Sequence, residues 1–158
     1  MTDLPTKTSL RATTKLACEI AKTHPDRFNE AVHANFYPCA PRTTPGKARS
    51  FAVDDIVALR LYQREMDAGM SASAAGAKVC AIREFMQVSP GAPRVFIIKT
   101  PLGDPDYLSE FDMRQDFTMI NDRQALEVIS CEMIDLNWHR ARIVHYLTEA
   151  DKNRVVGD

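Results

Sequence analysis

Three basic residues stand close together in a turn-forming segment of the chain. Arg42, Lys47 and Arg49 lie within PRTTPGKARS, which also holds two prolines and one glycine. Guanidinium and ammonium groups bind phosphates, so a segment of this kind is suited to a polyanion. The same composition is also typical of a solvated surface turn, and composition alone leaves both interpretations open.

Other residues that could do chemistry are poorly placed for it. His139 and His145 are six positions apart, which on a helix separates them by about 120° and prevents a shared metal ion or proton. The chain has no GxSxG, P-loop or GxGxxG motif. A run of carboxylates is typical of a solvated surface, and this run comprises Asp104, Asp106, Glu110, Asp112 and Asp116. We therefore predict that the protein is not an enzyme.

The four cysteines do not form the pattern of a metal site. Cys18, Cys39, Cys80 and Cys131 are 21, 41 and 51 positions apart, without a CxxC pair. Cys18 and Cys80 lie among apolar residues in helical patterns, where a free thiol behaves as a small core side chain. The N-terminus lacks a signal peptide's apolar run, and no stretch approaches membrane-spanning length. We expect a reduced, cytoplasmic protein without metal or cofactor.

The charge of the chain is unevenly distributed. Of its 158 residues 45% are hydrophobic, as in an ordinary globular protein. Residues 1–88 carry 12 Lys and Arg against 9 Asp and Glu, whereas residues 89–158 carry 8 against 12. The net charge of −1 argues against a protein that binds nucleic acid over its whole surface. The basic first half nevertheless permits one local polyanion-binding face.

Four helices are predicted around the basic segment. Apolar periodicity and capping residues place them at about 12–22, 25–36, 53–68 and 71–86. Thr13 or Thr14 can cap the first helix, and Thr23 or His24 the second. Residues 37–50, between the second and third helices, are typical of a turn or a short two-stranded ribbon.

A second module is predicted after residues 87–94, which hold two prolines and a glycine. We expect a buried strand at 95–98, an acidic loop at 104–112, and further strands at 115–120 and 125–136. The segment 125–136 also fits a helix. A closing helix over 137–152, capped by Asp135 or Asn137, would cover the sheet with its large apolar side chains, which are Trp138, Ile143, Tyr146 and Leu147.

The basic segment and the helix after it resemble the MerR family of transcriptional regulators. Family members have an arginine, a glycine, a second arginine, an aromatic residue, an Asp-Leu helix start and a Gly-aromatic-Ser turn. At those places this chain has Arg42, Gly46, Arg49, Phe51, Asp55-Ile56, Leu59 and Gly69-Met70-Ser71. The spacing matches without a gap from Arg49 to Ser71, and the resemblance covers about residues 13–88.

The resemblance implies a winged helix-turn-helix domain. The second helix would lie in the major groove of duplex DNA, and the basic segment would form a wing against the phosphates. Gly46 would let the wing turn tightly, and Phe51 would anchor its end. The residues implied to contact DNA are Lys15, Arg27, Asn29, His33, Arg42, Lys47 and Arg49, with Glu30 and Asn35 also on the outward face.

Two departures separate the chain from the family pattern. Arg27-Phe28-Asn29-Glu30 replaces the family's Arg-Tyr-Tyr run, and one extra residue lies between Gly46 and Arg49, so base preference cannot be carried over. Residues 87–94 also interrupt the path of the family's long dimerisation helix. Another part of the chain would then have to mediate dimerisation.

These patterns together predict a mostly α protein with a small β content, of the α+β class. A flexible N-terminus (1–12) would precede a MerR-like winged-helix domain (13–88) and a small α/β module (93–158). We expect a sequence-specific transcriptional regulator that binds double-stranded DNA as a homodimer, away from membranes. Its C-terminal module would dimerise or bind RNA polymerase or another protein. The alternative is a protein–protein interaction module or small-ligand sensor that keeps the fold without strong DNA binding.

Overall fold

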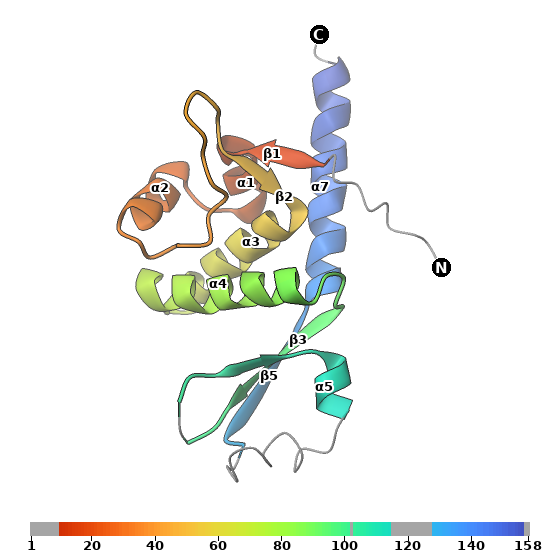
Figure 1. Ribbon diagram of the computed structural model, residues 1–158. Helices are drawn as coiled ribbons and strands as arrows, with labels where there is room; N and C mark the ends of the chain where they lie inside the picture. Colours follow the sequence, from red (N-terminus) through yellow and green to blue (C-terminus); the bar gives the residue numbers. More distant parts are fainter. Residues whose placement is uncertain (1–9, 102, 115–127, 157–158) are drawn as a thin grey trace. The chain divides into compact units, whose positions relative to one another are not determined.

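The computed structural model describes residues 10–101, 103–114 and 128–156, and it is of the α+β class (Figure 1). The chain divides into two units. The first comprises Met1–Cys80 and Arg140–Asp158, and the second comprises Ala81–His139. The division falls within the helices α4 (Ala72–Val88) and α7 (Leu136–Val156), so the predicted boundary at 87–94 lies inside the second unit. Among the described residues, no helix is both long and apolar enough to cross a membrane.

The four predicted helices of the first half are present. They are α1 (Thr14–Ala21), α2 (Pro25–His33), α3 (Val53–Asp67) and α4. Thr13 Oγ1 accepts the backbone N–H of Leu16 at 3.3 Å, and Ser71 Oγ accepts that of Ala74 at 3.2 Å. Local capping chemistry thus starts α1 and α4 where the sequence indicates. The second helix is shorter than predicted, because Asn35 takes a left-handed conformation with φ 59° and ends the helical path.

A short sheet in the first unit was not predicted. Strand β1 (Arg11–Thr13) pairs antiparallel with β2 (Ser50–Ala52), with Ala12 opposite Phe51. Arg11 and Ala12 are therefore ordered in a strand rather than loose. Of the two alternatives predicted for 37–50, the turn is confirmed and the two-stranded ribbon does not form. Residues 34–49, which we call the basic loop, are a connection without strands that runs from α2 to β2. Strands of three residues carry too little periodicity to be recognised in a sequence.

Aromatic rings hold the core of the first unit beneath α2 and the basic loop. The ring of Phe28 on α2 lies 5.6 Å from that of Phe51 on β2 and 5.5 Å from that of Tyr37. Tyr37 also meets the ring of Tyr62 on α3 at 5.0 Å. All four side chains are buried, and burial raises the pKa of Tyr62. Tyr37, and not Phe36, is the inward residue after α2, since Phe36 is 40% exposed.

The C-terminal helix α7 also contributes to the first unit. Arg140 Nε donates to Asp54 Oδ1 at 2.9 Å, which joins α7 to the first turn of α3. Ile143 and Leu147 are buried, but they belong to this unit and not to the second unit, which holds the predicted sheet. Trp138 and Tyr146 remain 49% and 42% exposed. The expectation that all four residues cover the predicted sheet is therefore wrong.

The second unit contains a three-stranded antiparallel sheet of order β4-β3-β5. Central β3 (Arg94–Lys99) confirms the predicted strand, whereas β4 (Asp106–Leu108) and α5 (Glu110–Arg114) occupy the segment predicted as an acidic loop. β5 (Ser130–Asp135) shows that the ambiguous segment is a strand over these residues. Asp135 Oδ1 accepts the N–H of Trp138 at 2.9 Å and caps α7, as predicted. The strand predicted at 115–120, and residues 125–127, lie outside the described residues.

Candidate functional site

A turn of three residues joins α1 to α2 and sets the direction of α2. Lys22 adopts a left-handed conformation with φ 60°, and the N–H of Thr23 donates to Cys18 O at 2.9 Å. His24 then caps α2, because its Nδ1 accepts the N–H of Asp26 at 3.2 Å. The guanidinium of Arg60 on α3 donates to Ala21 O at 3.3 Å and so binds a carbonyl at the C-terminal end of α1. Each of these interactions orients α2 through backbone groups.

The inward and outward faces of α2 are sharply different. Phe28 and Ala31 are buried. The polar side chains of the helix are exposed to solvent, and these are Asp26, Arg27, Asn29, Glu30 and His33. Arg27, Asn29 and His33 are thus accessible, as the sequence predicts, but two carboxylates share their surface. Lys15 is exposed on α1. The outward face of α2 offers hydrogen-bonding groups but no net positive charge, because one arginine stands against two carboxylates.

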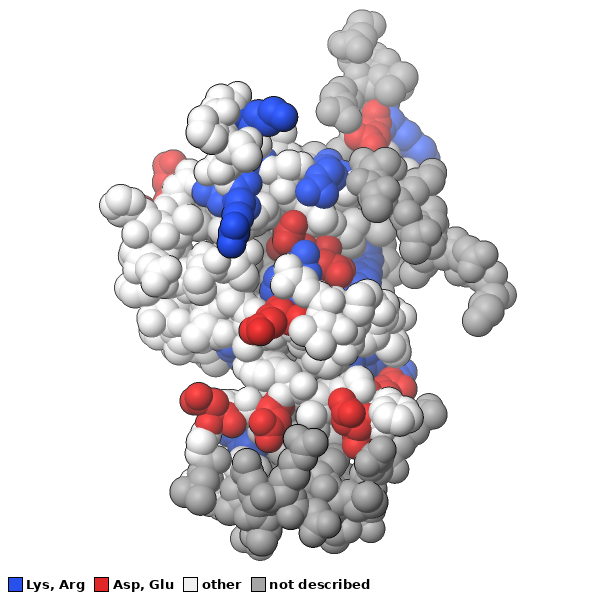
Figure 2. Space-filling view, in the orientation of Figure 1, with Lys and Arg blue, Asp and Glu red and all other residues white. Residues whose placement is uncertain are grey.

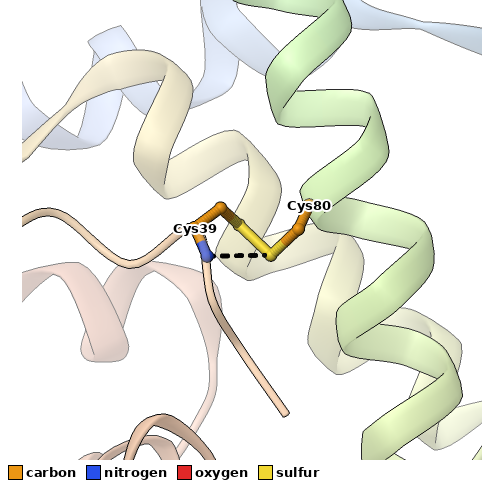
Figure 3. The surroundings of a disulfide bond; sticks show 2 residues. All are labelled: Cys39 and Cys80. Atoms are coloured by element: carbon orange, nitrogen blue, oxygen red, sulfur yellow. Dashed lines mark hydrogen bonds between the residues drawn. A yellow bond between two sulfur atoms is a disulfide. The ribbon is translucent and has the colours of Figure 1, made fainter. Parts of the chain in front are cut away.

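The basic loop leaves α2 and is held against α4 by a close backbone contact. A Cβ built on Gly76 would lie 1.7 Å from the carbonyl oxygen of Phe36, so only glycine allows α4 to approach the loop this closely. One turn further along α4, Cys80 forms a disulfide with Cys39 of the loop, with a Cα–Cα distance of 5.3 Å (Figure 3). The interpretation of Cys80 as a free core thiol is therefore wrong, whereas Cys18 is free and buried, as expected.

The far part of the basic loop is fixed by Arg49. Its guanidinium donates to the carbonyl oxygen of Pro41 across the loop and lies 5.9 Å from the centre of the Phe28 ring. Arg49 is half-buried, so it joins the two sides of the loop to each other and to α2. A guanidinium suits this position because it can stack on a ring while its N–H groups donate in the plane.

Arg42 and Lys47, in contrast, are exposed. Gly46 adopts φ 79° at the tip of the loop, where the N–H of Lys47 donates to Thr44 O at 3.0 Å. Figure 2 shows basic side chains over the part of the first unit that holds this loop. The structure thus separates the three predicted loop cations into one anchor, Arg49, and two exposed charges.

Sequence reasoning missed the disulfide between the basic loop and α4. The cysteines are 41 positions apart, and no local pattern marks them as partners. The one available signal is the four-residue spacing of Gly76 and Cys80, which places a residue without a side chain and a thiol on the same face of a helix. That spacing indicates a close neighbour for α4 but does not say which segment it is.

No protein-family model matches the chain, and no curated protein has a matching sequence. The interpretation of the site therefore depends on the residues and geometry of this chain.

Proposed function

We propose that the first unit is a winged helix-turn-helix that binds duplex DNA, in the manner of the MerR family that the sequence resembles. In this proposal α1, the turn after it and α2 form the helix-turn-helix, and the basic loop is the wing. The side chains of Arg27, Asn29 and His33 would face base edges, while Arg42 and Lys47 would contact phosphates. Lys15 would lie nearer the sugar-phosphate backbone of the DNA.

The observation that carries this proposal is that two exposed cations lie on a loop whose two ends are anchored. Pairing of β1 with β2, the Cys39–Cys80 bond, and the contacts of Arg49 with Pro41 and Phe28, which we call the Arg49 clamp, restrain the two ends of the basic loop. A loop that is already ordered loses little conformational entropy when it meets a phosphate backbone. Two exposed cations on such a loop therefore contribute more to affinity than the same charges on a flexible tail.

The proposal extends to the setting of the protein. We infer a cytoplasmic transcriptional regulator in which two copies bind a pseudo-palindromic site, since a dimer matches the two-fold symmetry of such a site. The C-terminal part of the chain would form the contacts between the two copies or a surface that binds another protein. Sedimentation of the full chain with and without duplex DNA measures the number of copies bound.

A salt titration tests DNA binding directly. The full chain should bind a mixed-sequence duplex, and the logarithm of its affinity should fall linearly with the logarithm of salt concentration. In Arg42→Ala/Lys47→Ala the slope should become shallower by about 2, one unit for each lost phosphate contact. Arg49 is left intact because its replacement would also disturb the loop.

The matched control removes two exposed lysines outside α2 and the basic loop. Lys99→Ala/Lys152→Ala changes the net charge by the same amount and should leave the slope near that of the wild type. An equal change in both double variants would mean that net charge, and not this loop, sets the affinity. Absence of salt-dependent binding to any duplex would refute the DNA-binding proposal and favour an interaction module or ligand sensor.

A further inference from the structure

The Cys39–Cys80 disulfide lies at the root of the basic loop. Cys39 belongs to the loop and Cys80 to α4, and both residues are half-buried. The backbone N–H of Cys39 also donates to Cys80 Sγ at 3.3 Å (Figure 3). The bond therefore fixes the first part of the loop to the part of α4 that belongs to the same unit.

Contacts inside the loop connect this bond to the exposed cations. Pro41, whose carbonyl accepts from Arg49, is two residues beyond Cys39, and Arg49 in turn lies on the Phe28 ring of α2. Arg42 follows Pro41 directly in the chain. The disulfide thus restrains the start of the segment that carries Arg42 and Lys47.

We propose that this disulfide is a redox-sensitive bond that controls how tightly the basic loop binds the DNA phosphate backbone. The inference rests on the proposed DNA-binding function. Disulfides in a reducing compartment are transient or redox-sensing rather than permanent. A bond that anchors the DNA-contacting loop of a cytoplasmic protein is well placed for such a role.

A dithiol reductant opens the bond by thiol–disulfide exchange. One thiolate of the reductant attacks Cys39 Sγ, a mixed disulfide forms, and Cys80 leaves as a thiolate. The Cys39 N–H faces Cys80 Sγ and stabilises the charge that develops there. The second thiol of the reductant then displaces Cys39, so the protein gains two electrons and two protons while the reductant becomes a cyclic disulfide. An oxidised dithiol reverses the reaction.

Reduction leaves part of the loop in place and releases the rest. Tyr37 remains buried, and the backbone of Phe36 remains against Gly76. Beyond these contacts, residues 39–49 keep the Arg49 clamp but lose their covalent link to α4. The loop must then be ordered when DNA binds, and the affinity of the reduced protein should be lower by about 5-fold or more.

The experiment measures the affinity of the full chain for a mixed-sequence duplex in buffers that hold the reduced and the oxidised form of one dithiol at graded ratios. Thiol trapping in the same samples gives the fraction of protein with the bond closed. Affinity should fall as that fraction falls and should return on reoxidation. Cys39→Ser/Cys80→Ser should have the low affinity at every ratio, whereas Cys131→Ser, which removes an exposed free thiol, should respond as the wild type does.

Hydrogen exchange of the full chain, without DNA, tests the mechanism. The backbone amides of Ala40 and Lys47, which donate to Tyr37 O and Thr44 O inside the loop, should exchange faster after reduction, and those of α3 should not. A change of affinity without faster exchange in the loop would overturn the proposed mechanism.

The outcomes distinguish this inference from the function it rests on. Equal affinity of the oxidised and reduced proteins, or a bond that opens only when the protein unfolds, would overturn redox control and leave DNA binding intact. No binding in either state would instead refute DNA binding, and redox control of it with it.

Discussion

Replacement of Gly76 by alanine provides a sharp test of how the basic loop is held on α4. Helix propensity alone predicts that Gly76→Ala stabilises the protein by about 1 kcal/mol. The new Cβ would, however, lie 1.7 Å from the oxygen and 2.8 Å from the carbonyl carbon of Phe36. Both are backbone atoms, and the neighbouring Tyr37 is buried, so the loop cannot move aside without loss of core packing.

The two effects have opposite signs, and their sizes decide the outcome. Forcing extra atoms into a packed site costs about 1–3 kcal/mol, occasionally more, and a clash with backbone belongs at the upper end of that range. The free energy of unfolding should therefore fall by about 2 kcal/mol after the gain in propensity is subtracted. The midpoint of thermal unfolding should fall by about 4–8 °C.

Urea unfolding followed by circular dichroism measures this change. Ala77→Gly is the matched control, because Ala77 is exposed on the same helix and its replacement should cost only the propensity difference of about 1 kcal/mol. A Gly76→Ala protein as stable as the wild type, or more stable, would show that α4 and the loop are not in close contact.

Three further predictions concern the buried thiol, the N-cap of α2 and the disulfide. Burial raises the pKa of Cys18 from 9.0 to about 11, so the thiol of the unfolded chain ionises at lower pH than that of the folded protein. The free energy of unfolding should therefore fall between about pH 9 and pH 11. Urea unfolding across this range measures the fall, which should be smaller in Cys18→Ala. His24→Ala removes the N-cap of α2, so the free energy of unfolding should fall by about 1 kcal/mol. His24→Asn keeps an acceptor at this position, so its free energy of unfolding should stay near that of the wild type. The disulfide closes a loop with a sequence separation of 41, so Cys39→Ser/Cys80→Ser should lower the free energy of unfolding in non-reducing buffer by about 4 kcal/mol; an unchanged urea midpoint would contradict this.

The features that sequence reasoning predicted correctly depend on neighbouring residues. His24, Pro25 and Asp26 start α2 because a cap, a fixed φ and a favourable charge act within one turn. Gly69, with φ 105°, ends α3 for a similarly local reason. The buried strand β3 is recognisable because its hydrophobic residues are consecutive in the chain.

The features that were missed depend on residues that are distant in sequence. Arg11 Nε donates to Ser50 Oγ 39 positions away, and nothing in the segment around Arg11 indicates a strand until its partner is known. Cys39 and Cys80 meet only because the helix packing of the first unit brings Gly76 against Phe36. Pairings of this kind follow from the tertiary fold and not from local propensity.

The same limit applies to the roles of the loop cations. In the sequence the three loop cations cannot be told apart by role. Only the structure shows that Arg49 is held by Pro41 and Phe28, while Arg42 and Lys47 are exposed. Since Asp26 and Glu30 outnumber Arg27 on the outward face of α2, that helix has no net positive charge with which to attract a polyanion. If the proposed function is correct, affinity must come mainly from Arg42 and Lys47, and specificity from α2. The bond that restrains those two cations would then change affinity for every DNA sequence without changing which sequence is preferred.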